Sequence, residues 1–386
     1  MKDPSRKPSD LLRAAGDNAS LKLFFSGDVM TGRGVDQILP HSVRPKLHEP
    51  RVRNARRYVR LAEAASGPIP KSVGFDYIWG DAIRELERAA PDLRVINLET
   101  AVTTSRDWWR GKKIHYRMHP RNTPILNAAH VDCCVLANNH VLDWGYAGLE
   151  ETLTSLRRAN VAIAGAGRNL EEARQPAVLE TPRGKRVLLF AAGSRSSGIP
   201  AEWAAASDRP GVYMIDEASP DTAAELRRFI EEHRRDGDRI VVSLHWSPNW
   251  NYRVPEAERR LAHALISEAG VDVVHGHSSH HIKGIEVYEN RPILYGCGDL
   301  LTDYEGIGKR FARFRGDLGS MYFVDLEAET GILRRLEMIP TEMNRIQIRT
   351  ADRGGSAWLA EVLNREGRRF GTGVELLHGG ALELTW

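Results

Sequence analysis

Cysteine and long apolar runs are both scarce in this chain, and each shortage excludes a class of protein. The 386 residues include only three cysteines, Cys133, Cys134 and Cys297. An odd number with two adjacent members predicts neither a disulfide framework nor a zinc ribbon. The longest uninterrupted apolar stretch covers residues 187–192, whereas a membrane span needs about 18 residues or more. We therefore expect no integral membrane segment.

An excess of charge of one sign is also missing. The chain has 54 Lys and Arg residues against 51 Asp and Glu residues, which gives a formal net charge of +3. So small an excess argues against a protein that coats nucleic acid, although a local basic patch is compatible with it. Residues 1–20 are polar and lack the apolar segment of a signal peptide. We therefore expect a disordered tail over residues 1–20, a cytoplasmic protein and no nucleic-acid partner.

Apolar strands alternate with helical patterns through most of the chain, and hydrophobic residues, at 42%, suffice for a sizeable core. Strands are expected at 22–26, 93–98, 131–137, 161–164, 186–192, 239–244 and 271–274, and helices at 49–65, 78–90, 122–129, 146–160, 220–235 and 256–269. A hairpin at 284–295 and paired strands at 321–326 and 332–339 follow, with a last helix near 357–366. This order predicts an α/β fold with mixed sheets, formed by a main domain over residues 21–345 and a C-terminal extension over 346–386 that packs on it.

The predicted helix over residues 49–65 is unusually rich in arginine. Its apolar residues recur every three or four positions, which is typical of an amphipathic helix. Between them stand Arg51, Arg53, Arg56, Arg57 and Arg60. These side chains fit a solvated helix face or an anion-binding surface.

Side chains that can bind a metal or transfer a proton gather where the predicted strands end. These positions hold Asp28, Asn97, Glu99, Asn138, Asn139, His140, His245, His275, His277, His280 and His281. The carboxyl ends of strands are where ligands bind in open α/β sheets. Oxygen and imidazole ligands without thiolate suit Mn, Fe or Zn and a hydrolytic two-metal site. Walker A, GxSxG and HExxH sequences are absent, so the chemistries that depend on them are not indicated.

The same segments resemble the CapA family, whose members are named for poly-γ-glutamate capsule synthesis. The resemblance extends from about residue 21 to residue 339, in the family's order. It rests on residues 27–34 (GDVMTGRG), 97–99 (NLE), 137–140 (ANNH), 245–246 (HW), 276–280 (GHSSH) and 293–296 (ILYG). CapA proteins belong to the calcineurin-like metallophosphoesterase superfamily. The resemblance therefore implies a sandwich of two mixed β-sheets flanked by helices, with the site on loops at strand ends.

Roles for individual residues follow from this resemblance. The implied metal ligands are Asp28, Glu99, Asn139, His245, His277 and His280, and His140 matches the catalytic histidine. Glu99 takes the position of the bridging acid between one metal position with Asp28 and His280 and another with Asn139, His245 and His277. One or two divalent ions (Mn, Fe or Zn) are the implied cofactors. Two departures from the superfamily and family patterns stand out: Met30 replaces a histidine ligand, and Ser247 with its neighbours replaces a Gly-containing segment.

The leading hypothesis is a metal-dependent hydrolase in which a metal-bound hydroxide attacks a phosphoester or a γ-glutamyl-type amide. His140 would protonate the leaving group or stabilise developing charge. The candidate contacts for an anionic small-molecule or γ-glutamyl substrate are Arg33, Arg117, Asn138, Asp299 and Glu305. The arginines equally fit structural salt bridges, and Asp299 fits a loop cap. The alternative is an accessory protein in the synthesis or export of poly-γ-glutamate or a related capsule polymer.

Overall fold

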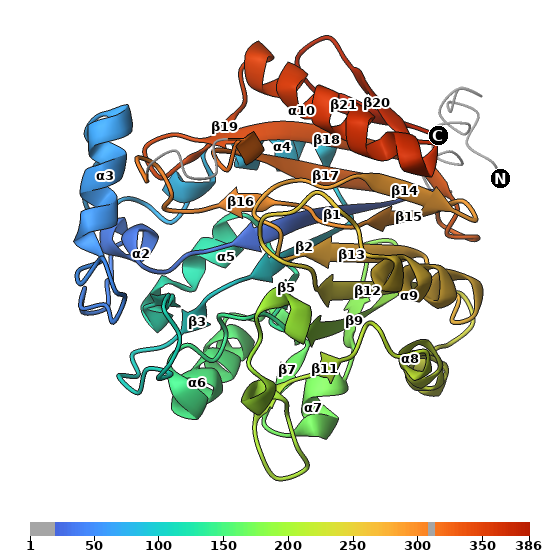
Figure 1. The fold of residues 1–386 in the computed structure, drawn as a ribbon, viewed down its shortest axis with the longest axis horizontal. Coiled ribbons are helices and arrows are strands. Elements are labelled where there is room, and N and C mark those ends of the chain that lie inside the picture. Colours follow the sequence, from blue (N-terminus) through green and yellow to red (C-terminus); the bar gives the residue numbers. More distant parts are fainter. Residues whose placement is uncertain (1–19, 308–312) are drawn as a thin grey trace, which may run out of the picture.

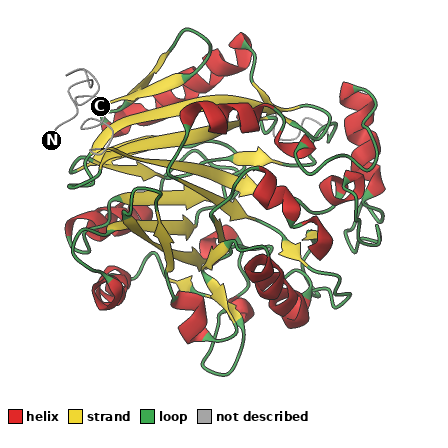
Figure 2. Cartoon of the chain, turned by 180° about the vertical axis from the view of Figure 1, so that it is seen from behind, coloured by secondary structure: helices red, strands yellow, loops and turns green. Residues whose placement is uncertain are grey.

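Two mixed β-sheets lie face to face and carry helices on their outer surfaces (Figure 1). This computed structural model describes residues 20–307 and 313–386. The tail predicted over residues 1–20 lies outside the described residues, apart from Ser20. The two large sheets and the helices that flank them confirm the expected α/β sandwich of two mixed sheets. Figure 2 shows the layers from behind, with the strands between the helices.

The first sheet has ten strands within the described residues, in the order β20-β21-β18-β17-β1-β2-β5-β6, with β16 beside β1 and β19 beside β18. Strands β1, β2, β5 and β6 are parallel, whereas β17, β18, β20 and β21 pair antiparallel. The strands are β1 (Ser20–Val29), β2 (Leu93–Leu98), β5 (Cys133–Val135), β6 (Ala162–Ala164), β16 (Asp299–Leu301), β17 (Leu318–Glu327), β18 (Leu333–Met343), β19 (Ile348–Thr350), β20 (Gly373–Leu376) and β21 (Leu382–Thr385). The parallel half brings the carboxyl ends of four strands to one edge.

The second sheet has seven strands in the part of the chain described, in the order β11-β9-β12-β13-β15-β14, with β8 beside β9. Its centre is parallel, and β14 and β15 form the predicted hairpin. The strands are β8 (Ala177–Glu180), β9 (Arg186–Ser194), β11 (Met214–Ile215), β12 (Arg239–His245), β13 (Val273–His277), β14 (Ile285–Tyr288) and β15 (Arg291–Leu294). Two short pairs lie apart from both sheets: β3 (Ala101–Val102) with β4 (Arg117–Met118), and β7 (Ala166–Gly167) with β10 (Gly211–Val212).

Three apolar clusters hold the layers together. The cluster between the sheets includes Phe25 of β1, Val95 of β2, Leu189 of β9 and Val241 of β12. Phe24 points to the other face of β1, because side chains alternate along a strand, and joins the cluster under the first group of helices. That group contains α4 (Asp81–Ala89), α5 (Pro124–Ala128) and α6 (Gly145–Arg158). Helices α8 (Asp221–His233) and α9 (Glu256–Ser267) cover the second sheet, and α10 (Arg353–Gly367) packs on the antiparallel half of the first.

The helix predicted over residues 49–65 begins later than expected, and this part of the prediction is wrong. Helix α3 covers Arg56–Ser66. The segment before it forms a loop in which the Leu47 N–H donates to Arg53 O at 3.0 Å and the Ala55 N–H donates to Pro45 O at 2.7 Å. The backbone groups that a helix would use are therefore paired across the loop. The remaining helices are α2 (Gly34–Ile38) and α7 (Leu170–Arg174), and no helix in the described ranges is both long and apolar enough to cross a membrane.

Candidate metal centre

Strand ends from both sheets meet at one point of the sandwich. Asp28 lies near the end of β1, opposite Asn97 of β2 on one side and Asp299 of β16 on the other. His245 and His277 are the last residues of β12 and β13 and stand directly opposite each other. Because these strand pairs are parallel, their carboxyl ends share an edge. The arrowheads of β1, β12 and β13 point toward the same side of the molecule in Figure 1.

Two groups of buried side chains have the geometry of metal ligands. Asp28, His245 and His277 form one group, and Asp28, His280 and Asp299 form the other. Within each group the ligand atoms lie within 4.8 Å of one another. Asp28 is therefore the shared member in this geometry, whereas the family resemblance gives that position to Glu99.

Several buried polar atoms of this centre are suited to bind a cation. Five buried ligand-type atoms here have no hydrogen-bond partner among the described residues: Asp28 Oδ2, Glu99 Oε2, Asn139 Oδ1, His245 Nε2 and Asp299 Oδ2. A buried polar atom left without a partner costs about 1–3 kcal/mol. Oxygen and imidazole nitrogen donors without sulfur are the ligands that Mn, Fe and Zn accept. The residues present therefore fit one or two divalent ions.

The carboxylates of the centre repel one another, which also favours a cation. Burial, and then the neighbouring Asp299, raise the pKa of Asp28 to about 6. Burial, and then Asp28, raise the pKa of Glu99 well above its ordinary value. Burial raises the pKa of Asp299 too. Bound divalent ions would offset this repulsion, since an opposite charge nearby favours the ionised carboxylate.

The histidines of the centre differ in the direction in which their pKa values are shifted. Burial lowers the pKa values of His245 and His277 well below the ordinary value, so both imidazoles are neutral, which is the form that binds a metal. Burial also acts against protonation of His280, but the carboxylates of Asp299 and Asp28 outweigh it and raise its pKa. His280 Nδ1 lies 2.8 Å from Asp299 Oδ1 and 3.8 Å from Asp28 Oδ2.

A chain of polar contacts fixes the two central histidines. His245 Nδ1 lies 2.7 Å from His277 Nδ1, and His277 Nε2 lies 2.9 Å from the Ser243 hydroxyl. The same hydroxyl is 3.0 Å from His275 Nδ1, and His275 Nε2 is 2.9 Å from Ser26 O on the first sheet. His275 therefore connects the two sheets beneath the ligands and contributes to the orientation of both rings.

His140 lies beside the centre and is held by Asp143 and Lys112, neither of which was among the residues predicted from the sequence. Its Nδ1 is 2.6 Å from Asp143 Oδ2, and its Nε2 is 3.7 Å from Glu99 Oε1. Asp143 Oδ1 pairs with Lys112 Nζ at 2.6 Å. Burial lowers the pKa of His140 to about 4, although Asp143 acts in the opposite direction. Asp143 could have been found from its position three residues after His140, whereas no local signal marks Lys112.

The structure places Arg33 in an internal ion pair. Its side chain is buried, and its Nε lies 3.1 Å from Asp303 Oδ2 while a second nitrogen also contacts that carboxylate. Nη1 reaches the Glu49 carboxylate at 3.4 Å and the Tyr58 hydroxyl at 3.2 Å. All three nitrogens of Arg33 are thus engaged within the chain, and its contact with a substrate stays a prediction.

Asn138 supports the loop that carries the catalytic candidate. Its Nδ2 donates to Asn97 Oδ1 at 3.0 Å and to Leu98 O at 2.9 Å, and its Oδ1 accepts from the His140 N–H at 3.1 Å. The side chain therefore joins the end of β2 to the loop after β5. Its neighbour Asn139 leaves its own Oδ1 unpartnered at the centre.

Glu305 and Arg117 contact other loops. Glu305 accepts from the Ser66 hydroxyl at 2.7 Å and from the backbone N–H groups at positions 345 and 346 at 2.8 and 2.5 Å. Arg117 donates to Ser105 O and, at 3.1 Å, to Arg44 O. As contacts for a substrate of the metal centre, both stay predictions.

Comparison with known proteins places the chain in a family. The family model described as "Bacterial capsule synthesis protein PGA_cap" matches residues 22–304. The chain is 43% identical over 371 residues, 96% of its length and 97% of the relative's, to the "Probable polyglutamine synthesis accessory protein" of Mycobacterium tuberculosis. It is 26% identical over 284 residues, 73% of its length and 63% of the relative's, to the "PGA biosynthesis protein CapA" of Bacillus subtilis. A solved structure described as a novel phosphatase of Mycoplasma pneumoniae is 11% identical, with a TM-score of 0.47 and coverage of 86% of this chain and 95% of that one. The extent of the family match and the nearly full-length relative show that the chain belongs to the family of the bacterial capsule synthesis protein PGA_cap.

Proposed function

We propose that this chain is a divalent-metal-dependent hydrolase that acts on a phosphoester or on an amide of the γ-glutamyl type. The observation that carries the proposal is the set of five buried, unpartnered oxygen and nitrogen atoms around Asp28. A second observation supports catalysis rather than metal storage, because His140 lies beside these atoms and has its own orienting carboxylate.

Different residues of the centre would bind the metal ions and transfer the proton. Divalent ions, when bound, supply Lewis acidity to a phosphoryl or carbonyl centre. Asp28, His245, His277, His280 and Asp299 would hold the ions, and the carboxylates of Asp28 and Asp299 would provide the negative charge that balances them. The same side chains are buried, so the centre has few water molecules to screen its charges and its electrostatic interactions are strong.

His140 would act as the general acid that protonates the leaving group. Its Nδ1 is engaged by Asp143, which leaves Nε2 as the nitrogen that faces Glu99 and the centre. Because burial lowers the pKa of His140 to about 4, the imidazole is neutral at pH 7. It would first accept a proton released by the attacking water and then deliver that proton to the oxygen or nitrogen that departs from the substrate. Burial acts to raise the pKa of Asp143, but His140 and then Lys112, which pairs with this carboxylate, lower the pKa below its ordinary value, so the carboxylate stays ionised.

Metal content is the first test. The full chain is purified without chelator, reconstituted with Mn²⁺ and measured by elemental analysis, together with His277→Ala and the exposed-site control His378→Ala. We expect about one to two equivalents in the wild type and in His378→Ala, and a loss of at least half in His277→Ala. A wild type that holds less than about a tenth of an equivalent would refute the proposal.

Activity is the second test, and it separates the two substrate classes. The Mn²⁺-loaded chain is assayed on phosphomonoesters, phosphodiesters and γ-glutamyl peptides. Replacing His140 by alanine should lower the rate by about 10²–10⁴-fold, as for other general acids and bases, while metal content stays at the wild-type value. An unchanged rate in this variant would contradict the role given to His140.

A second candidate function is an accessory role in making or exporting a glutamate polymer. The name of the Mycobacterium tuberculosis relative, 43% identical over nearly the whole chain, favours it. The test is complementation in a host that has lost the corresponding gene, with polymer measured as the readout. Full complementation by His277→Ala would show that the accessory role does not need the metal centre. If His277→Ala fails to complement while His378→Ala succeeds, the accessory role depends on the metal centre.

A further inference from the structure

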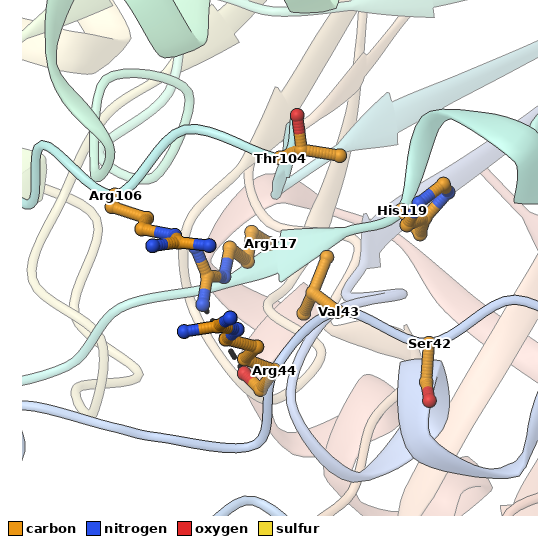
Figure 3. A pocket seen from close by; sticks show the side chains of 7 residues that line it. All are labelled: Ser42, Val43, Arg44, Thr104, Arg106, Arg117 and His119. Atoms are coloured by element: carbon orange, nitrogen blue, oxygen red, sulfur yellow. Dashed lines mark hydrogen bonds between the residues drawn. The ribbon is translucent and has the colours of Figure 1, made fainter.

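A pocket of about 200 Å³ opens between the loop before α3 and strand β4 (Figure 3). Three arginines, Arg44, Arg106 and Arg117, bring their guanidinium groups together on one side of it, as the close-up shows. His119, Ser42 and Thr104 complete the polar lining. We call this feature the basic pocket.

Among the residues that the structure describes, the arginines of the basic pocket have no carboxylate partner. None of the three forms an ion pair with Asp or Glu within the described parts of the chain. Arg117 is the most enclosed, at 6% exposure, and its nitrogens donate to two backbone carbonyls while its guanidinium lies 3.6 Å from the centre of the Trp144 ring. A buried cation that faces other cations is costly unless an anion joins it.

The nearby acidic residues, Asp36 and Glu151, accept hydrogen bonds from the backbone of the loops that line the pocket. Asp36 accepts from the His119 N–H and the Val43 N–H, each at 2.7 Å. Glu151 accepts from the backbone N–H of Thr104 at 2.8 Å. The two carboxylates thus hold the loops that carry the lining residues, and neither forms an ion pair with the three guanidinium groups. The backbone of these loops is therefore held in place before an anion binds, so binding requires little ordering of the backbone.

Electrostatics agree with this geometry. Burial, opposed by Asp36 and reinforced by the neighbouring Arg106, lowers the pKa of Arg117 to about 10. The guanidinium is still charged at neutral pH, but it is less stable in that form than an exposed arginine is. An oxyanion in the pocket would remove the repulsion and accept two hydrogen bonds from one guanidinium group.

The basic pocket is separate from the metal centre. Tyr116, next to Arg117, turns its ring toward His140 at a centroid distance of 4.6 Å, and its N–H donates to Asp143 at 2.7 Å. Arg117 itself points into the basic pocket. Tyr116 therefore contacts residues beside the metal centre, whereas the next residue, Arg117, lines the basic pocket. A ligand in the pocket need not contact the metal ligands.

We propose that the basic pocket is a second anion-binding site, which takes a carboxylate or phosphate group of a small or oligomeric anionic ligand. The three guanidinium groups supply charge and paired donors, and His119, Ser42 and Thr104 supply further polar contacts. The proposal does not rest on hydrolysis at the metal centre. A site of this kind suits either a chain of glutamate residues or a phosphorylated compound, and the experiment separates the two.

The test compares the wild type with the double variant Arg44→Gln/Arg106→Gln. Both side chains are exposed, so their removal leaves the fold intact, and Arg228→Gln on the exposed face of α8 is the matched control. Binding of inorganic phosphate and of γ-linked triglutamate to the full chain is measured by calorimetry, with and without Mn²⁺. We expect at least tenfold weaker binding of the preferred probe by the double variant, unchanged binding by Arg228→Gln, and wild-type binding that persists without metal.

Each outcome decides the proposal. Binding of phosphate alone or of triglutamate alone, lost in the double variant, supports the site and identifies its ligand class. Wild-type affinity in the double variant would overturn it, as would loss of binding only when Mn²⁺ is removed or His277 is replaced by alanine. The absence of any binding to the wild type up to about 10 mM, the weak end of specific recognition, would also overturn it. None of these results depends on hydrolytic activity, so the proposed function stands or fails separately.

Discussion

Replacing Lys283 by methionine should remove a buried, charged hydrogen-bond donor outside the candidate metal centre. Lys283 is 1% exposed, and its Nζ donates to the Ser247 hydroxyl at 2.7 Å. That hydroxyl lies 2.5 and 2.7 Å from the two carboxylate oxygens of Glu258, which is also 1% exposed. The serine therefore connects a buried cation to a buried anion. Methionine keeps the length of the apolar stem but removes the ammonium group, with both its charge and its hydrogen-bond donors.

The expected loss of unfolding free energy is large because Glu258 would keep only the Ser247 hydroxyl as a polar partner among the described residues. Removing one member of a buried charged pair costs about 3–5 kcal/mol of the free energy of unfolding. Protonation limits this cost, since burial already raises the pKa of Glu258 to about 7. We therefore expect about 3 kcal/mol at pH 7.5. The double variant Lys283→Met/Glu258→Gln should recover about 1–2 kcal/mol, as coupled neighbours do.

Denaturant unfolding followed by tryptophan fluorescence measures the effect. The control is Lys71→Met, which changes an exposed lysine and should shift the free energy of unfolding by no more than about 0.5 kcal/mol. A loss below about 1 kcal/mol in Lys283→Met, within the range of exposed ion pairs, would refute the reasoning. Full additivity of the Lys283 and Glu258 variants would refute the coupling through Ser247.

The dependence on pH gives an independent check of the same cluster. The folded-state pKa of Glu258 is about 7 against an ordinary 4.5, so the folded chain keeps a proton that the unfolded chain releases. The contribution of Glu258 to the free energy of unfolding therefore falls as the pH rises from 4.5 to about 7. Burial lowers the pKa of Lys283 from 10.5 to about 8, so the unfolded chain holds the extra proton and the contribution rises between about pH 8 and 10.5. The rise above pH 8 should be absent in Lys283→Met.

Three further predictions concern the centre and its surroundings. Asp143→Asn should lower the hydrolytic rate through misorientation of His140, shift its pH profile and leave Mn²⁺ content unchanged; a normal profile would contradict the positioning role. Arg33→Met should cost about 3–5 kcal/mol of stability, because Asp303 would be left buried without its cation; a value near zero in the same unfolding assay would show that the pair is dispensable. Chelator treatment of the Mn²⁺-loaded chain should lower the melting temperature measured by calorimetry, since buried ligand atoms lose their partner; an unchanged temperature would argue against a filled centre.

Local pattern accounts for what could be predicted of the fold. The strand over residues 93–98 was expected with the bounds that β2 has, because a short apolar run between turn residues depends little on distant contacts. The helix expected from residue 49 begins at Arg56, because Glu49 is drawn into the buried cluster with Arg33 and Tyr58. A helical spacing of apolar residues cannot reveal such a contact.

The sequence predicted which polar residues gather at the site, because polar side chains that follow apolar strands of a parallel sheet lie at one edge. The chain itself therefore determined the α/β class and the collection of Asp28, His245 and His277 at one place. Only the tertiary structure decided that Asp28 is the member common to both ligand groups and that Lys112 reaches Asp143. It also decided that Arg33 forms ion pairs, whereas Arg117 has no carboxylate partner among the described residues. These features depend on distances between segments far apart in sequence, which are set by how the two sheets pack and not by the pattern within any one segment.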